Sequence, residues 1–163
     1  KLIRVLRERI PGVTLRSTFI VGFPGETEMQ YQTLVKFLEE VRLDCVGAFP
    51  YSQEEGTPAG QMTGQLEDAL KEQRAVDLMD HQFDLMYAKH LQAVGTTRVV
   101  KVDEISPDVA GLLLCRSQGE APDVDPLILV YDDWSHQPGD FLEVKITGLD
   151  EYDFIGEIIH ELA

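Results

Sequence analysis

The stretch that decides the fold is "STFIVGFPGET", Ser17–Thr27, in which an apolar run meets a corner built from glycines and a proline. The apolar run ends a longer segment, Val13–Val21, whose β-branched and aromatic residues predict a strand buried on both faces. Glycine at such a corner lets the backbone approach a ligand closely, and a helix beginning next to it would supply N–H donors. The corner is therefore a candidate ligand contact, with a plain strand-to-helix turn as the alternative.

A helix is predicted directly after this corner. Thr27 can cap it, Gln30 three residues later completes a capping box, and apolar residues at helical spacing follow at Leu34, Phe37, Leu38 and Val41. Asp44–Tyr51 reads as a second strand and runs into a polar, turn-prone segment. Strand, helix and strand in this order predict a parallel βαβ unit.

One long helix is predicted next, over Leu66–Val94, with Gly95 ending it. Its apolar stripe is expected to consist of residues recurring at spacings of three and four: Leu66, Ala69, Leu70, Val76, Met79, Phe83, Met86, Leu91 and Val94. Short strand-like runs separated by Pro and Gly follow at Arg98–Ile105, Val109–Ser117, Leu127–Asp132, Phe141–Thr147 and Asp153–Ile159. They predict a small barrel, so the chain divides into residues 1–64, a connecting helix at 65–96 and a barrel at 97–163.

The 163 residues carry a net charge of −15, and the charge is uneven. Residues 1–96 hold 10 Lys/Arg and 14 Asp/Glu, whereas residues 97–163 hold 4 and 15, a net −11. An acidic barrel disfavours nucleic-acid phosphates and favours a basic partner, with an acidic surface kept for solubility as the alternative. The apolar runs are far shorter than the ~20 residues that cross a bilayer, so no membrane contact is expected.

Cys45 and Cys115 each lie in an apolar, strand-like context, which predicts two buried, reduced thiols in a cytoplasmic protein. The four histidines show no metal-ligand spacing, so no metal site is expected, and His81 and His90 are predicted to lie on the helix surface. The corner has neither P-loop nor dinucleotide-binding spacing. The chain begins at Lys1 inside a helical pattern, so we expect a piece of a longer protein.

Three segments carry a resemblance to a known family. "STFIVGFPGET" and "YSQEEGTPA" resemble the later strands of the radical S-adenosylmethionine barrel of methylthiotransferases, and "GDFLEVKITGLDEYDFIGE" resembles the end of the TRAM barrel that follows it. The resemblance covers nearly the whole chain. It implies an α/β fold, the C-terminal part of a TIM-like radical S-adenosylmethionine barrel, followed by a small all-β five-stranded TRAM (OB-like) barrel.

The family has two main branches, one modifying tRNA adenosine and one modifying an aspartate of a small-subunit ribosomal protein. "GAFPYSQEEGTPA" and "APDVDPLILVYDD" are more similar to the second branch. The acidic barrel points the same way, because a domain that binds tRNA should be basic. A tRNA adenosine methylthiotransferase remains one alternative. A non-catalytic acidic module that binds a basic protein is the other.

The resemblance implies S-adenosylmethionine and two [4Fe–4S] clusters in the full-length protein, the first held by a C-x-x-x-C-x-x-C motif. Cys45 and Cys115 cannot form that motif, so we expect no catalytic or metal-ligating residue, no cofactor and no activity in this fragment alone. Ile20, Val21 and Gly22 are implied near the adenosyl group, with Phe49 and Tyr51 at the same mouth. Ordinary barrel packing is the alternative for each of these residues.

Two further expectations concern charged residues. Arg16 shares a strand face with Thr18 and Ile20, and as a buried arginine it should have a carboxylate partner, more plausibly a structural one than the cofactor or substrate. The acidic barrel is expected to dock a basic small-subunit ribosomal protein. The candidate docking residues are Asp123, Asp125, Asp132 and Asp133.

Overall fold

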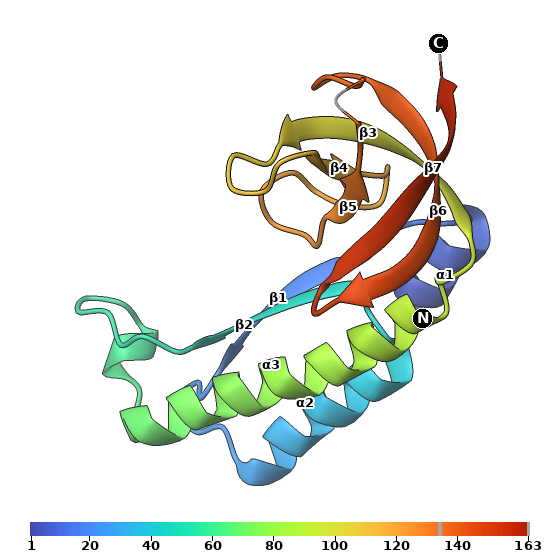
Figure 1. Ribbon diagram of the computed structural model, residues 1–163. Helices are drawn as coiled ribbons and strands as arrows, with labels where there is room; N and C mark the ends of the chain where they lie inside the picture. The colour runs from blue at the N-terminus through green and yellow to red at the C-terminus, as the bar shows by residue number, and fades with distance from the viewer. Residues whose placement is uncertain (134, 163) are drawn as a thin grey trace. The chain divides into compact units, whose positions relative to one another are not determined.

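The computed structural model describes residues 1–133 and 135–162, which form two compact units, Lys1–Met86 and the residues from Tyr87 onward. The helices and strands of the first unit are α1 (Leu2–Arg9), β1 (Arg16–Val21), α2 (Glu28–Val41), β2 (Cys45–Pro50) and a short 3-10 turn at Ala59–Gln61 (Figure 1). The long helix α3 (Asp68–Leu91) follows and ends in the second unit. The division between the units therefore falls inside α3.

The predicted βαβ unit is confirmed. β1 and β2 pair in parallel, with Arg16 opposite Cys45 and Val21 opposite Pro50. The capping box is also present, since the Gln30 N–H donates to Thr27 Oγ1 at 3.3 Å and the Thr27 N–H donates to Gln30 Oε1 at 2.8 Å. This reciprocal pair satisfies two of the N–H groups that the first turn of α2 would otherwise leave without partners.

The prediction that β1 is buried on both faces is wrong. Phe19 and Val21 pack into a core with Leu38 of α2 and Leu78 of α3. The alternate residues, Arg16, Thr18 and Ile20, are exposed. Successive side chains of a strand point to opposite faces, so the helices cover only one face of this two-stranded sheet.

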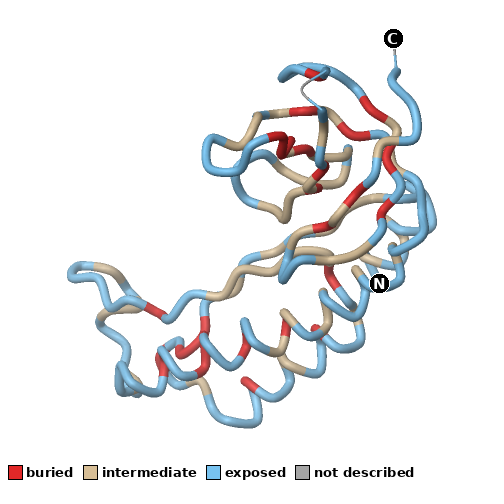
Figure 2. Tube along the Cα trace, in the orientation of Figure 1, coloured by how far each residue is buried: buried red, intermediate tan, exposed pale blue. Residues whose placement is uncertain are grey.

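The second unit is a closed barrel, which confirms the five-stranded prediction. Its strands are β3 (Thr97–Ile105), β4 (Leu112–Arg116), β5 (Ile128–Tyr131), β6 (Phe141–Asp150) and β7 (Asp153–Leu162), in the spatial order β3-β4-β5-β7-β6. All neighbouring strands run antiparallel except β5 and β7, which are parallel. Along much of each strand, buried residues alternate with less buried ones (Figure 2). The inward residues, from Val100 to Phe154, form one core.

The cysteines and the helix histidines depart in part from expectation. Cys115 lies in the barrel core, and burial raises the pKa of its thiol to about 12, but Cys45 is only half-buried. His81 is partly exposed, with its Nε2 3.4 Å from Glu39 Oε1. His90 does not lie on the helix surface, because its ring packs on Phe154 with the ring centroids 4.3 Å apart, and burial lowers its pKa. Among the described residues, no helix is long and apolar enough to cross a membrane.

Candidate functional site

The corner, defined here as Gly22–Thr27, follows the carboxyl end of β1. Gly22 and Gly25 adopt left-handed backbone conformations, with φ of +74° and +81°. The Gly25 N–H donates to the Gly64 carbonyl at 2.8 Å, and the Glu26 N–H donates to the Phe23 carbonyl at 2.8 Å. The N–H groups of Gly25 and Glu26 are therefore engaged within the turn and by a neighbouring segment, and that of Thr27 by the cap of α2.

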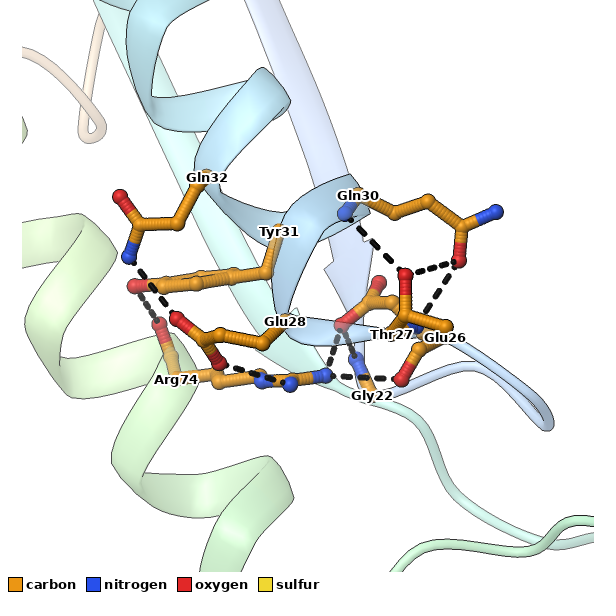
Figure 3. A network of polar contacts seen from close by, with 8 residues as sticks. All are labelled: Gly22, Glu26, Thr27, Glu28, Gln30, Tyr31, Gln32 and Arg74. Atoms are coloured by element: carbon orange, nitrogen blue, oxygen red, sulfur yellow. Dashed lines mark hydrogen bonds and ion pairs between the residues drawn. The ribbon is translucent and has the colours of Figure 1, made fainter.

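A buried arginine from α3 holds the corner. The Arg74 side chain is 5% exposed, and its Nη1 lies 2.7 Å from Glu26 Oε1 and 3.2 Å from the Glu26 carbonyl oxygen. Its Nη2 lies 3.0 Å from Glu28 Oε2. The same Glu26 Oε1 accepts the Gly22 N–H at 2.9 Å (Figure 3). One carboxylate oxygen therefore joins the end of β1 to α3.

Two more side chains of α2 complete this network. The Arg74 guanidinium lies 5.2 Å from the centre of the Tyr31 ring, and the Tyr31 hydroxyl donates to the Arg74 carbonyl at 3.1 Å. Burial raises the pKa of Tyr31. The pKa of Glu28 is lowered, first by the hydrogen bond from Gln32 and then by the one from Arg74. The charged form of the Glu28 carboxylate is thus favoured.

The sequence analysis missed this network because it assigned α3 the wrong face. The structure buries Lys71, Arg74, Ala75, Leu78 and Gln82, whereas Leu70 and Val76 of the predicted stripe are 42% and 55% exposed. Arg74 and Gln82 contact groups outside α3, whereas Lys71 pairs with Asp68 in the first turn of the same helix. The partners of Arg74 and Gln82 lie tens of residues away in sequence, so no local pattern signals them.

Gly22 is also a point of close contact between α3 and the end of β1. A Cβ added at Gly22 would lie 2.6 Å from Lys71 Cγ and 2.9 Å from Lys71 Cβ. The Lys71 side chain is 5% exposed, with its Nζ 2.8 Å from Asp68 Oδ1 and 5.6 Å from the centre of the Tyr51 ring. The side of Gly22 that lacks a Cβ therefore faces this lysine.

The residues implied near the adenosyl group lie on different faces of the β1–β2 sheet. Ile20 and Phe49 are register partners, each 60% exposed, on the face of the sheet that the helices leave open. The Val21 side chain is fully buried among the helices. Arg16 begins the open face and is exposed, so the expectation of a buried arginine there is wrong.

Tyr51 follows β2 and is 9% exposed. Its N–H donates to the Val21 carbonyl at 2.8 Å, and its ring meets Phe23 edge-on with the centroids 5.3 Å apart. Its hydroxyl is buried and has no hydrogen-bond partner among the described residues. A buried hydroxyl without a partner is costly, so among the five candidate residues Tyr51 is the one whose side chain holds an unsatisfied polar atom.

The candidate docking residues do not gather in one patch. Asp123 and Asp125 precede β5 and Asp132 and Asp133 follow it, so the strand separates the two pairs. Asp123 and Asp133 are exposed, whereas Asp125 is half-buried and accepts the Ala121 N–H at 2.7 Å. The Asp132 side chain is only 4% exposed. Asp132 is therefore not an exposed charge, contrary to its place in the docking set.

Asp132 instead binds a buried histidine. Its Oδ1 lies 2.8 Å from His136 Nδ1, and its Oδ2 accepts the His136 N–H at 3.1 Å. On the other side of the ring, His136 Nε2 lies 3.2 Å from Glu161 Oε1 of β7. Burial alone would raise the pKa of Asp132, but the hydrogen bonds from His136 outweigh it and lower that pKa to about 2. Burial alone would lower the pKa of His136, but Asp132 and Glu161 outweigh it and raise that pKa.

Three of the barrel's four Lys and Arg residues lie beside carboxylates, and the fourth, Lys145, is exposed. Arg98 Nη1 is 3.1 Å from Glu120 Oε1, and its guanidinium lies 4.3 Å from the centre of the Phe154 ring. Asp103 binds Arg116 at 2.6 Å and Lys101 at 3.5 Å. Arg98 therefore has its own carboxylate partner, whereas Lys101 and Arg116 share Asp103. Elsewhere, the described residues contain no group of three His, Cys, Asp or Glu side chains that could hold a metal ion.

Comparison with known protein families matches residues 94–159 to the TRAM domain. The chain is 43% identical over 158 residues to the "Ribosomal protein uS12 methylthiotransferase RimO" of Desulfitobacterium hafniense, a match that covers 97% of this chain and 35% of the relative. The proteins of the same name from Bdellovibrio bacteriovorus and Heliobacterium modesticaldum are each 43% identical, over 96% and 99% of this chain and 34% of each relative.

The chain thus spans about a third of the length of the curated relatives it matches. The match extends across both units, since it covers nearly every residue. This chain is therefore a RimO-like sequence of the methylthiotransferase family, equivalent to about a third of a full-length relative, with a TRAM domain in its second unit.

Proposed function

We propose that this chain is the C-terminal part of an enzyme that adds a methylthio group to an aspartate of ribosomal protein uS12. One observation carries the proposal: 40–43% identity, over nearly the whole chain, to proteins named as uS12 methylthiotransferases. In the full-length protein, S-adenosylmethionine and two [4Fe–4S] clusters would supply the radical and sulfur chemistry. The βαβ unit would then be the last part of the barrel that binds S-adenosylmethionine.

The residues present do not fit an iron–sulfur cluster. The two cysteines, Cys45 and Cys115, belong to different units, and the latter is sealed in the barrel core. A [4Fe–4S] cluster needs three or four cysteine thiolates close together. We therefore assign the cluster ligands to the part of the protein outside this chain, and no catalytic or metal-ligating role to the residues within it.

The residues present do fit one side of an S-adenosylmethionine site. Ile20 and Phe49 offer an exposed apolar surface at the carboxyl ends of two parallel strands, where ligands bind in α/β barrels. The buried Tyr51 hydroxyl supplies a polar group that lacks a partner. Val21 and Gly22 would contribute backbone, because the Val21 side chain is in the core and Lys71 occupies the side of Gly22 where a Cβ would be.

The acidic barrel supports a protein partner over a nucleic acid. Residues 97–163 carry a net −11, and Arg98, Lys101 and Arg116 contact carboxylates of the barrel itself. Binding phosphates would require breaking those contacts and overcoming the net repulsion. Binding of a basic ribosomal protein would neither require breaking these contacts nor be opposed by the net charge. Asp123 and Asp133 are the exposed members of the candidate docking set.

Deletion of the gene that encodes the full-length protein tests the proposal. uS12 isolated from the parent strain is expected to contain an aspartate in which one hydrogen is replaced by a methylthio group, detected by peptide mass spectrometry. The deletion strain should lose this modification and regain it on complementation. Unmodified uS12 in the parent, together with loss of a methylthioadenosine from tRNA in the deletion strain, would establish the tRNA branch instead.

A further inference from the structure

The geometry around Glu26 links α3 to the end of β1 through a single oxygen atom. Glu26 Oε1 accepts the Gly22 N–H at 2.9 Å and lies 2.7 Å from Arg74 Nη1. The Glu26 side chain is 15% exposed and that of Arg74 is 5% exposed, so water screens this contact poorly. A rotation of the Glu26 carboxylate away from Arg74 would also remove the acceptor of the Gly22 N–H.

The arrangement requires an arginine rather than any cation. Arg74 uses Nη1 for Glu26 and Nη2 for Glu28, while its guanidinium plane lies over the Tyr31 ring. A planar fork can serve two carboxylates and an aromatic ring at once, whereas a lysine ammonium acts as a point charge. Buried ion pairs contribute little net stability after desolvation, but they fix the groups they join. The expected effect of Arg74 is therefore on position.

We propose that Arg74 is a positioning residue for S-adenosylmethionine, acting through Glu26 on the backbone of Gly22. This inference rests on the proposed function. Gly22 directly follows β1, two residues after Ile20, whose side chain lies on the open face of the sheet. Holding Gly22 in its left-handed conformation fixes where β1 ends and thus where Ile20 and the corner face a bound cofactor. Arg74 itself does not touch the ligand.

The test uses the full-length enzyme with its clusters reconstituted under anaerobic conditions. The dissociation constant for S-adenosylmethionine and the thermal midpoint are measured for the wild type, Arg74→Met, Arg74→Lys, Glu26→Gln and the double variant Arg74→Met/Glu26→Gln. Tyr31→Phe is the structural control, because it removes a hydrogen bond to the Arg74 carbonyl and leaves Glu26 untouched. Arg4→Lys makes the conservative change at an exposed ion pair with Glu8.

Arg74→Met is expected to weaken S-adenosylmethionine binding about tenfold and Arg74→Lys by a smaller factor. The double variant should bind no worse than the weaker single variant, because both substitutions interrupt one path. Tyr31→Phe should lower the thermal midpoint without changing the dissociation constant, and Arg4→Lys should change neither. If Arg74→Met does not fold, Arg74→Lys and Glu26→Gln provide the same comparison.

Two outcomes overturn the inference while leaving the proposed function intact. In one, the wild type binds S-adenosylmethionine and modifies uS12, but Arg74→Met and Arg74→Lys bind the cofactor as the wild type does. In the other, the effects of Arg74→Met and Glu26→Gln multiply in the double variant, which would mean independent actions. A reconstituted wild type that neither binds S-adenosylmethionine nor modifies uS12 would overturn the proposed function, and this inference with it.

Discussion

Gly22 meets two separate demands at the end of β1. Its φ of +74° lies in the left-handed region, which costs a residue with a side chain about 1 kcal/mol or more. Its missing Cβ also leaves room for the Cβ and Cγ atoms of Lys71, and the Cβ position is fixed by the backbone of α3. Gly25 meets only the first demand, since among the described residues nothing lies within 4 Å of where its Cβ would be.

Gly22→Ala should therefore destabilise the first unit by about 2–4 kcal/mol, the sum of backbone strain and overpacking. Gly25→Ala, the matched control, should cost only the backbone part, about 1 kcal/mol. Chemical denaturation of the 163-residue chain, followed by a probe in the first unit, measures both. Equal losses for the two variants would show that Lys71 does not restrict this position.

Among single residues, contacts between sequence neighbours were predictable from the sequence, and contacts between residues far apart in sequence were not. Thr27 and Gln30 were predictable because a capping box depends on residues three apart. Arg74 and Lys71 were not, because their burial depends on Glu26 and Gly22, which lie more than 40 residues away. Among the candidate site residues, strand alternation put Ile20 on the face of Arg16, but it did not reveal that the Val21 side chain belongs to the core.

Among the elements, the segment after β5 is tied to β7 by His136. This histidine is 7% exposed, and its two ring nitrogens face Asp132 and Glu161. An imidazole can donate from both nitrogens only when it is protonated, and two flanking carboxylates favour that form. The raised pKa of His136 reflects this arrangement.

A folded-state pKa above the unfolded value of about 6.5 means that His136 stabilises the barrel fully below that pH. The contribution is lost as the pH rises through the folded-state pKa. His136→Gln should therefore cost about 1–2 kcal/mol more at pH ~5.5 than at pH ~9. Asp132 stays ionised over this range, since its pKa is about 2.

Urea denaturation of the wild type and of His136→Gln at a series of pH values measures this difference. His90, whose pKa is lowered, contributes equally to both proteins and cancels. His160→Gln is the control, because His160 lies exposed on β7. The same loss of stability at all pH values would mean that His136 is neutral in the fold.

The positions of the helices and strands were well predicted. Which face of each one is buried was not. All five barrel strands match predicted segments, because Pro and Gly mark the turns between short apolar runs. The buried faces of β1 and α3 were misassigned because burial depends on which elements cover each face. That information is a property of the packed unit, and periodicity in one segment does not contain it.

For the molecule as a whole, the uneven charge of this chain makes a prediction about the proposed docking of uS12. If the acidic barrel docks uS12, the affinity for uS12 should fall several-fold between low and high salt, because the Debye length shrinks from about 10 Å at 0.1 M to about 3 Å at 1 M. Asp123→Asn/Asp133→Asn should weaken binding at low salt. Asp80→Asn/Asp84→Asn removes two exposed charges from the first unit and should leave binding unchanged.

Titrations of the full-length protein with uS12 and with tRNA, each at low and at high salt, measure these affinities. Tight tRNA binding without uS12 binding would contradict the assignment of the partner. Equal weakening by the two double variants would show that net charge matters and that Asp123 and Asp133 do not mark the docking face.

The way in which β7 closes the barrel has a consequence for the nascent chain. β7 pairs in parallel with β5 and antiparallel with β6, so two of the five strand pairings of the barrel depend on Asp153–Leu162. As the polypeptide leaves the ribosome, β3, β4, β5 and β6 emerge with edges that only this strand can cover. We expect the barrel to close only after Leu162 has cleared the exit tunnel, and until then these strands depend on chaperones to avoid aggregation.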